Sequence, residues 1–305
     1  MRKLAIGVDI GGTRTKVGLV DIDNGEVFDQ LIYPTETKSS EVFLAQMKDA
    51  IHTFKEKVKA TSEQIKGIGF GIPGFIFPNG MIDTTYGSVD FMEYYPLKQL
   101  IEDEHQITCA LDNDARVIAL GESLYGIGKD YKRVLVLTLG TGVGVGFTIE
   151  GKLNEPLAFA HMAGHITITD NEYPCYCGRT GCLESLVSAT GMCQLAKRAG
   201  WEKDDKNAEI TAEYIFKQRE IGNPLAVKLV DQYINYLKTG IDNYANIYAP
   251  DVVILGGGVA KGLVNDLHKL HNKSLLFPYQ TYKTDLKTSI LEESSGILGA
   301  AALLN

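Results

Sequence analysis

The sequence predicts an α/β protein in which strands alternate with amphipathic helices. Four segments rich in apolar and β-branched residues each run into a glycine, which is typical of strands that end at a turn. They span Leu4 to Ile10, Ile65 to Phe70, Val134 to Leu139 and Val252 to Leu255. Helical patterns separate these segments, and that alternation indicates an α/β protein. With 305 residues, the chain is long enough for two domains.

The helical patterns are clearest in three places. Between Phe43 and Val58, apolar residues recur every three or four positions, which predicts a helix with one buried face. Asn223 followed by Pro224 predicts the start of a second helix, because Asn caps helices and Pro is favoured at their first position. Its buried face is expected to continue through Leu237, Ile241, Tyr244 and Tyr248. The small residues from Ser295 to Ala301 predict a helix that packs tightly on another element.

Composition and charge restrict the partners of the protein. The 30 Lys and Arg against 38 Asp and Glu give a net charge of −8, which leaves no overall basic surface for nucleic acid or acidic lipid. No apolar run reaches the roughly 18 residues of a membrane span, and no secretory signal is recognisable at the N-terminus. We therefore expect a cytoplasmic protein that binds small molecules. The odd number of cysteines, five, favours reduced thiols or metal ligands over a disulfide framework.

Two glycine-rich loops follow predicted strands. The stretch Asp9-Ile10-Gly11-Gly12-Thr13-Arg14-Thr15-Lys16 puts a carboxylate before two glycines, and Gly140-Thr141-Gly142 forms a similar loop later in the chain. Backbone N–H groups of such turns can point at phosphate oxygens, while the carboxylate can hold a hydrated Mg²⁺. Each loop alone is more typical of a plain hairpin. Together they indicate a site for the phosphate tail of a nucleotide.

Other nucleotide motifs are not supported. Residues Gly69 to Gly74 match the dinucleotide pattern G-x-G-x-x-G after a strand, but the residues behind them do not begin a helix. A Walker sequence is absent. Near residue 256, a strand runs into Gly256-Gly257-Gly258, which suits the close approach of an adenine or ribose, although a simple turn explains the pattern as well.

Asp112-Asn113-Asp114 lies where a strand passes into a helix. A carboxylate at such a junction can accept the proton of a hydroxyl group that attacks phosphorus. The alternative is that Asp or Asn only caps the helix.

The strongest local motif is H-x9-C-x-C-x4-C. Three thiolates and an imidazole form a tetrahedral Zn²⁺ shell with no position left for water, so the predicted site is structural. Its ligands are His165, Cys175, Cys177 and Cys182. Cys109 and Cys193 are predicted to be small core residues. Glu184, two residues after the motif, could bind a polyol or serve as a first-turn acid of a helix.

In this order, the motifs resemble the ROK family of sugar kinases and sugar-responsive repressors, within the actin-like ATPase (ribonuclease H-like) superfamily. The resemblance covers nearly the whole chain, and the knuckle from Cys175 to Glu184 is its most specific part. It implies two α/β lobes around a cleft, a smaller one of residues 1–115 with 291–305 and a larger one of residues 116–290. It also implies a homodimer.

The resemblance implies a role for each motif. The first phosphate loop would comprise Asp9, Gly11, Gly12, Thr13 and Lys16. The second phosphate loop would comprise Gly140, Thr141 and Gly142. The adenosine site would include Gly256, Gly257 and Gly258. Asp114 would be the general base. The sugar would be contacted by Gly74, Asn113, Asp114, His165 and Glu184. His165 would use the ring nitrogen that does not bind zinc.

Two residues depart from the family pattern. Met162 stands where the family usually has a Glu that holds sugar hydroxyls, and a thioether cannot replace those hydrogen bonds. The sugar is therefore expected to be configured or substituted differently from glucose. Arg116 stands where the family often has Asn. It could reach a phosphate or form a salt bridge on the helix surface, and we favour the surface.

These observations predict an ATP-dependent kinase that phosphorylates a sugar hydroxyl, O6 above all, with Mg²⁺ bound to ATP and a structural Zn²⁺. The alternative is a sugar-binding member of the same family without catalysis. A DNA-binding repressor is not expected, because the first phosphate loop begins at Asp9 and leaves no room for a helix-turn-helix before it. A nucleic-acid zinc module is disfavoured by the acidic charge.

Overall fold

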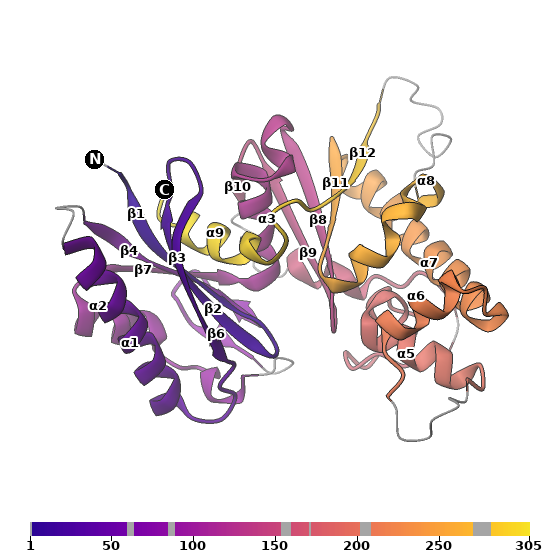
Figure 1. Ribbon diagram of the computed structural model, residues 1–305, viewed down its shortest axis with the longest axis horizontal. Helices are drawn as coiled ribbons and strands as arrows, with labels where there is room; N and C mark the ends of the chain where they lie inside the picture. The colour runs from indigo at the N-terminus through magenta and orange to yellow at the C-terminus, as the bar shows by residue number, and fades with distance from the viewer. Residues whose placement is uncertain are drawn as a thin grey trace. The chain divides into compact units, whose positions relative to one another are not determined.

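The computed structural model describes residues 2–59, 64–84, 89–153, 160–170, 172–201, 209–270 and 282–305 (Figure 1). The chain forms two compact units. The first unit comprises Met1–Lys132, Gly146–His161 and Ile290–Asn305, and the second comprises Arg133–Val145 and Met162–Ser289. The lobes expected from the sequence, 1–115 with 291–305 and 116–290, stay a prediction.

The first unit is built on a five-stranded sheet. Its strands are β1 (Leu4–Ile10), β2 (Arg14–Asp21), β3 (Glu26–Pro34), β4 (Ile65–Ile72) and β7 (Thr108–Asn113), in the order β3-β2-β1-β4-β7. β1, β2 and β3 are antiparallel neighbours, whereas β4 and β7 run parallel to β1. The register pairs Asp9 with Gly71 and Ile72 with Asn113, so the carboxyl ends of β1, β4 and β7 meet at one edge of the sheet. A small hairpin of β5 (Phe75–Ile76) and β6 (Ile82–Asp83) follows β4.

Helices cover both faces of this sheet (Figure 1). One face carries α1 (Ser40–Lys59) and α2 (Leu97–His105), and the other carries α3 (Asp114–Leu124) and α9 (Ser295–Ala302). The apolar face predicted for α1 is confirmed: Phe43, Met47, Ile51, Phe54 and Val58 are buried against β1 and β4. β1 itself alternates, with Ile6 and Val8 facing α1 and Ala5 facing α9.

The backbone of α9 lies directly on the sheet. A Cβ atom on Gly7 would stand 1.8 Å from the carbonyl oxygen of Ile297, and one on Gly69 would stand 1.8 Å from that of Ala300. Only glycine allows this approach. The tight packing predicted for the small-residue helix is therefore confirmed.

The second five-stranded sheet has the order β10-β9-β8-β11-β12, where the strands are β8 (Arg133–Leu139), β9 (Val143–Ile149), β10 (Lys152–Leu153), β11 (Val252–Gly256) and β12 (Asp285–Thr288). β11 runs parallel to both β8 and β12. Its pairing of Gly256 with Thr138 brings the carboxyl ends of β8 and β11 to the same edge. The helices of the second unit are α4 (Glu184–Val187), α5 (Ala189–Arg198), α6 (Ala212–Glu220), α7 (Pro224–Tyr248) and α8 (Leu267–Leu270). Short 3-10 helices occur at Asp90–Met92, Ile127–Asp130, Ala160–His165, Gly258–Asp266 and Glu292–Ser294.

The start predicted for α7 is confirmed, because Asn223 caps it by accepting hydrogen bonds from the N–H groups of Leu225 and Ala226. No helix among the described residues is both long and apolar enough to cross a membrane.

Candidate active site and metal centre

The first glycine loop is the tight turn between β1 and β2. The N–H of Gly11 donates to the carbonyl of Arg14 at 3.1 Å, and Thr35 Oγ1 donates to the carbonyl of Gly11 at 2.6 Å. These two hydrogen bonds fix the turn of a hairpin, which was one of the two interpretations of the stretch from Asp9 to Lys16. A Cβ atom on Gly12 would nevertheless meet no atom within 4 Å among the described residues other than its chain neighbours. Packing against other residues therefore does not require glycine at position 12. A glycine at this position is consistent with a backbone that a ligand approaches closely.

Asp9 lies at the end of β1 in a crowded electrostatic setting. Burial raises the pKa of Asp9 to about 6; Lys16 opposes the increase, while Asp114 and Glu293 add to it. Lys16 Nζ donates to the carbonyl oxygen of Glu293 at 3.1 Å and lies 3.5 Å from its carboxylate. Gly296, in the first turn of α9, lies against Asp9, since a Cβ atom there would stand 2.3 Å from Asp9 Cγ. One partly buried carboxylate beside a bare loop is the donor set that Mg²⁺ uses when a nucleotide supplies the remaining oxygens.

Asn113 ends β7, two strands away from β1 in the sheet, and Asp114 begins α3. Asn113 Oδ1 accepts from the N–H groups of Ala115 and Arg116 at 3.0 and 3.2 Å, so the capping interpretation is confirmed for Asn113. Its Nδ2 donates to the carbonyl of Gly74 at 3.0 Å and to Asp114 Oδ1 at 2.9 Å. These four bonds use the whole hydrogen-bonding capacity of the amide.

The Asp114 carboxylate is held through one oxygen. Oδ1 accepts from the N–H of Ala115 at 2.9 Å and from Asn113, whereas Oδ2 accepts no hydrogen bond from any other described residue. Burial raises the pKa of Asp114, and the hydrogen bonds from Ala115 and Asn113 oppose that increase. The structure therefore brings four predicted site residues of the first unit to one sheet edge, namely Asp9, Gly74, Asn113 and Asp114.

The surface position expected for Arg116 is wrong. Its side chain is buried, and Nε and Nη2 donate to the two carboxylate oxygens of Asp112 at 2.6 and 3.2 Å. Two hydrogen bonds to one carboxylate offset part of the cost of burying a guanidinium away from water. The expected salt bridge exists, but it lies inside the unit because Asp112 stands one helical turn earlier at the end of β7.

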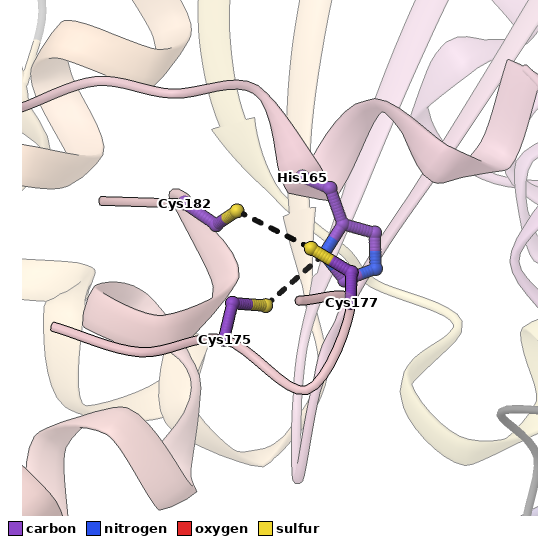
Figure 2. Close-up of side chains that lie close together, drawn as sticks. All are labelled: His165, Cys175, Cys177 and Cys182. Carbon is purple, nitrogen blue, oxygen red and sulfur yellow. Dashed lines mark hydrogen bonds between the residues drawn. The ribbon is translucent and has the colours of Figure 1, made fainter. Parts of the chain in front are cut away.

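The predicted zinc ligands converge in the second unit (Figure 2). The ligand atoms of His165, Cys175, Cys177 and Cys182 all lie within 4.8 Å of one another. Cys177 Sγ is 3.7 Å from Cys182 Sγ, and Cys175 Sγ is 3.3 Å from His165 Nδ1. Tetrahedral Zn²⁺ with bonds of about 2.3 Å to sulfur separates two sulfur ligands by about 3.8 Å. The cluster therefore fits a zinc ion bound through Nδ1 of His165.

The other ring nitrogen of His165 contacts a residue that sequence reasoning missed. Nε2 lies 3.1 Å from the hydroxyl of Tyr176, whose ring meets the imidazole edge-on at a centroid distance of 5.0 Å. Burial raises the pKa of this hydroxyl, and the nearby Glu184 carboxylate adds to the increase. Glu184 Oε2 accepts from the N–H of Val143 at 3.0 Å. The available signal was the place of Tyr176 between two ligand cysteines, which fixes its backbone beside the metal centre.

The second glycine loop connects β8 with β9. The N–H of Gly140 donates to the carbonyl of Gly142 at 3.0 Å, and α5 holds the loop through Ala189 N–H on Gly140 O at 2.8 Å and Thr190 Oγ1 on Thr141 O at 3.0 Å. Apart from its chain neighbours, no residue that the structure describes would come within 4 Å of a Cβ atom on Gly140. Gly140 in this loop therefore resembles Gly12 in the first loop, because packing against other residues does not require glycine at either position.

The three glycines after β11 differ from one another. Gly257 has φ of +82°, and a Cβ atom there would stand 2.5 Å from the carbonyl oxygen of Leu139, so its turn alone requires glycine. In the described part of the chain, a Cβ atom on Gly258 would meet no atom within 4 Å beyond its chain neighbours, and one on Gly256 would make only ordinary van der Waals contacts. Gly258 is therefore the member of the trio that fits the approach of a ligand.

The match to known proteins covers the chain as a whole. The model of the ROK family matches residues 5–305. The chain belongs to the ROK family. A glucokinase from Halalkalibacterium halodurans is 32% identical, with 98% of this chain and 94% of that protein aligned. An N-acetylgalactosamine kinase, AgaK, from Shewanella sp. is 29% identical, with 97% and 95% aligned.

A solved structure gives the same result for the fold. The ROK family glucokinase from Streptomyces griseus, crystallised with glucose and AMPPNP, superposes with a TM-score of 0.80 at 25% identity over 98% of both chains. The two-sheet α/β fold expected from the resemblance is thereby confirmed, and this ROK protein is an enzyme of the sugar kinase class.

Proposed function

We propose that this ROK sugar kinase transfers the γ-phosphoryl group of ATP to a primary sugar hydroxyl, O6 of a hexose, hexosamine or glucoside. The observation that carries the proposal is the pair of carboxylates, Asp9 and Asp114, at the same edge of one sheet, where they follow β1 and β7 on either side of β4. Asp9 lies beside the first glycine loop, where a Cβ atom on Gly12 would make no close contact. Asp114 is held through hydrogen bonds to Oδ1, which leaves Oδ2 to accept a proton from the substrate.

On the nucleotide side, the N–H groups of both glycine loops bind the phosphates, and Lys16 adds a positive charge beside the first loop. Asp9 holds the hydrated Mg²⁺ of the nucleotide, which neutralises charge on the β- and γ-phosphates when bound. Residues Gly256 to Gly258 border the adenosine.

On the sugar side, the hydroxyl attacks phosphorus while its proton passes to Asp114 Oδ2, and ADP leaves with the electron pair of the broken P–O bond. Asn113 and Gly74 hold Asp114 in place, and direct sugar binding by Asn113 requires one of its four bonds to be exchanged. Glu184 binds another sugar hydroxyl, and His165 Nε2 binds one in exchange for its contact with the Tyr176 hydroxyl. Met162 supplies no such bond, so the preferred sugar differs from glucose at the hydroxyls that a Glu there would bind.

The test is an ADP-release screen over hexoses, hexosamines, N-acetyl sugars and β-glucosides, run with the wild type and with Asp114→Asn. The variant keeps the shape of the side chain but cannot take the proton, so turnover should fall at least about 10²-fold while the Kd of the sugar changes little. Asp103→Asn, an exposed change on α2, is the matched control and should leave turnover intact.

Retained turnover in Asp114→Asn contradicts the assignment of the base. A wild type that binds a sugar of the panel by calorimetry and releases no ADP instead supports the second candidate function, a sugar-binding member of the family without catalysis.

A further inference from the structure

The Glu184 carboxylate contacts the second glycine loop directly. Its Oε2 accepts the N–H of Val143, the residue that follows the loop, at 3.0 Å. A Cβ atom on Gly142 would stand 3.1 Å from the same oxygen, so the loop passes close over the carboxylate. Glu184 is 8% exposed, and water does not compete freely for this bond. The carboxylate thus fixes the exit of the loop.

The segment that begins at Glu184 also holds the rest of the loop. Ala189 N–H donates to Gly140 O, and Thr190 Oγ1 donates to Thr141 O. The conformation of residues 140–142 is therefore specified by bonds from residues 184–190.

Glu184 is itself fixed by the metal centre. It follows the ligand Cys182 by two residues, and its carboxylate lies close to the hydroxyl of Tyr176, which contacts His165 Nε2. A continuous set of contacts therefore runs from the imidazole of the cluster through Tyr176 and Glu184 to the backbone of the loop.

We infer that Glu184 is a positioning residue for the nucleotide: its hydrogen bond to Val143 holds the N–H groups of the second glycine loop in the arrangement that binds phosphate. This inference rests on the proposed function, because it takes residues 140–142 as a phosphate loop. The charge of Glu184 cannot produce the same effect. A carboxylate near a triphosphate repels it, so loss of the charge alone strengthens nucleotide binding or leaves it unchanged.

The experiment separates the hydrogen bond from the charge. The Kd of AMPPNP with Mg²⁺ is measured by calorimetry without sugar, on protein of measured zinc content, for the wild type, Glu184→Gln and Glu184→Met. Gln removes the charge but keeps an oxygen that accepts from Val143, whereas Met has a similar volume and no such oxygen. Glu172→Gln, an exposed change in the same unit, is the control for charge.

We expect Glu184→Gln to bind AMPPNP at least as tightly as the wild type and Glu184→Met to bind it about fivefold or more weakly, the effect of losing a buried hydrogen bond. If Glu184→Met does not fold, Glu184→Ala replaces it. Equal Kd values for the Gln variant and the variant without an acceptor overturn the inference. A wild type that does not bind AMPPNP overturns the proposed function instead, so the two failures are distinguishable.

Discussion

Asp9 offers the sharpest test of the site, because its charge is unfavourable in the folded protein. Burial at the end of β1 raises its pKa from 3.8 to about 6, against the opposing effect of Lys16. The folded state therefore holds this proton more tightly than the unfolded chain does. The stability that the protonated group contributes is present below pH 4 and is lost as the pH rises through 6.

The magnitude follows from 1.36 kcal/mol per pKa unit. For a pKa that rises from 3.8 to about 6, the ionised carboxylate destabilises the folded protein by about 3 kcal/mol at pH 8 and by about half as much at pH 5. Asp9→Asn has the same shape and no charge. The variant should therefore exceed the wild type in the free energy of unfolding by up to about 3 kcal/mol at pH 8, and by about half of that at pH 5.

The assay is urea unfolding of the wild type and Asp9→Asn at pH 5 and pH 8, without nucleotide or Mg²⁺. Asp29→Asn is a control of opposite sign, because the hydrogen bond from Lys57 lowers the pKa of Asp29 and the charge there is favourable. The same Asp9→Asn protein should lose ATP-dependent turnover. A variant that is no more stable than the wild type at pH 8, or whose advantage is the same at both pH values, would refute the reasoning.

Three further outcomes are expected. Removal of zinc by a chelator, or Cys177→Ser, should lower the Tm and weaken sugar binding, as followed by metal analysis and calorimetry; a zinc-free protein with full sugar affinity contradicts this. Asn113→Ala should reduce the free energy of unfolding by about 1–2 kcal/mol, because α3 loses its cap, and should lower kcat; unchanged urea unfolding argues against it. Gly299→Ala should prevent stable folding, since its Cβ would stand 1.6 Å from the carbonyl oxygen of Val117. Gly12→Ala should leave the Tm nearly unchanged and raise the Kd of AMPPNP. A Gly299→Ala protein that is more stable than Gly12→Ala would contradict this prediction.

Features that depend on neighbours in the sequence were predictable. The strand from Leu4 to Ile10 has the bounds that its apolar run indicates, and the apolar face of α1 follows from its period. The metal cluster was predictable for the same reason, since three of its four ligands lie within eight residues of sequence and their chemistry is specific.

Features that depend on a distant or unexpected partner were not. Arg116 was misplaced because its burial depends on the carboxylate of Asp112, and a sequence pattern does not show whether two charges pair inside or outside. Tyr176 was missed because a tyrosine between cysteines reads as an ordinary surface residue until its hydroxyl is seen between His165 and Glu184. Gly257 illustrates a third limit: its glycine is required by the carbonyl of Leu139, more than a hundred residues earlier.

The position of α9 in the first unit has a consequence for synthesis. The glycine-lined face of β1 and β4 receives α9, yet residues 295–302 leave the ribosome after the whole of the second unit. Until then, the sheet that bears Asp9 lacks part of its cover, and the second unit is complete before the first. A nascent chain stalled before α9 should therefore expose an apolar sheet face to chaperones, although every residue of both glycine loops has already been made.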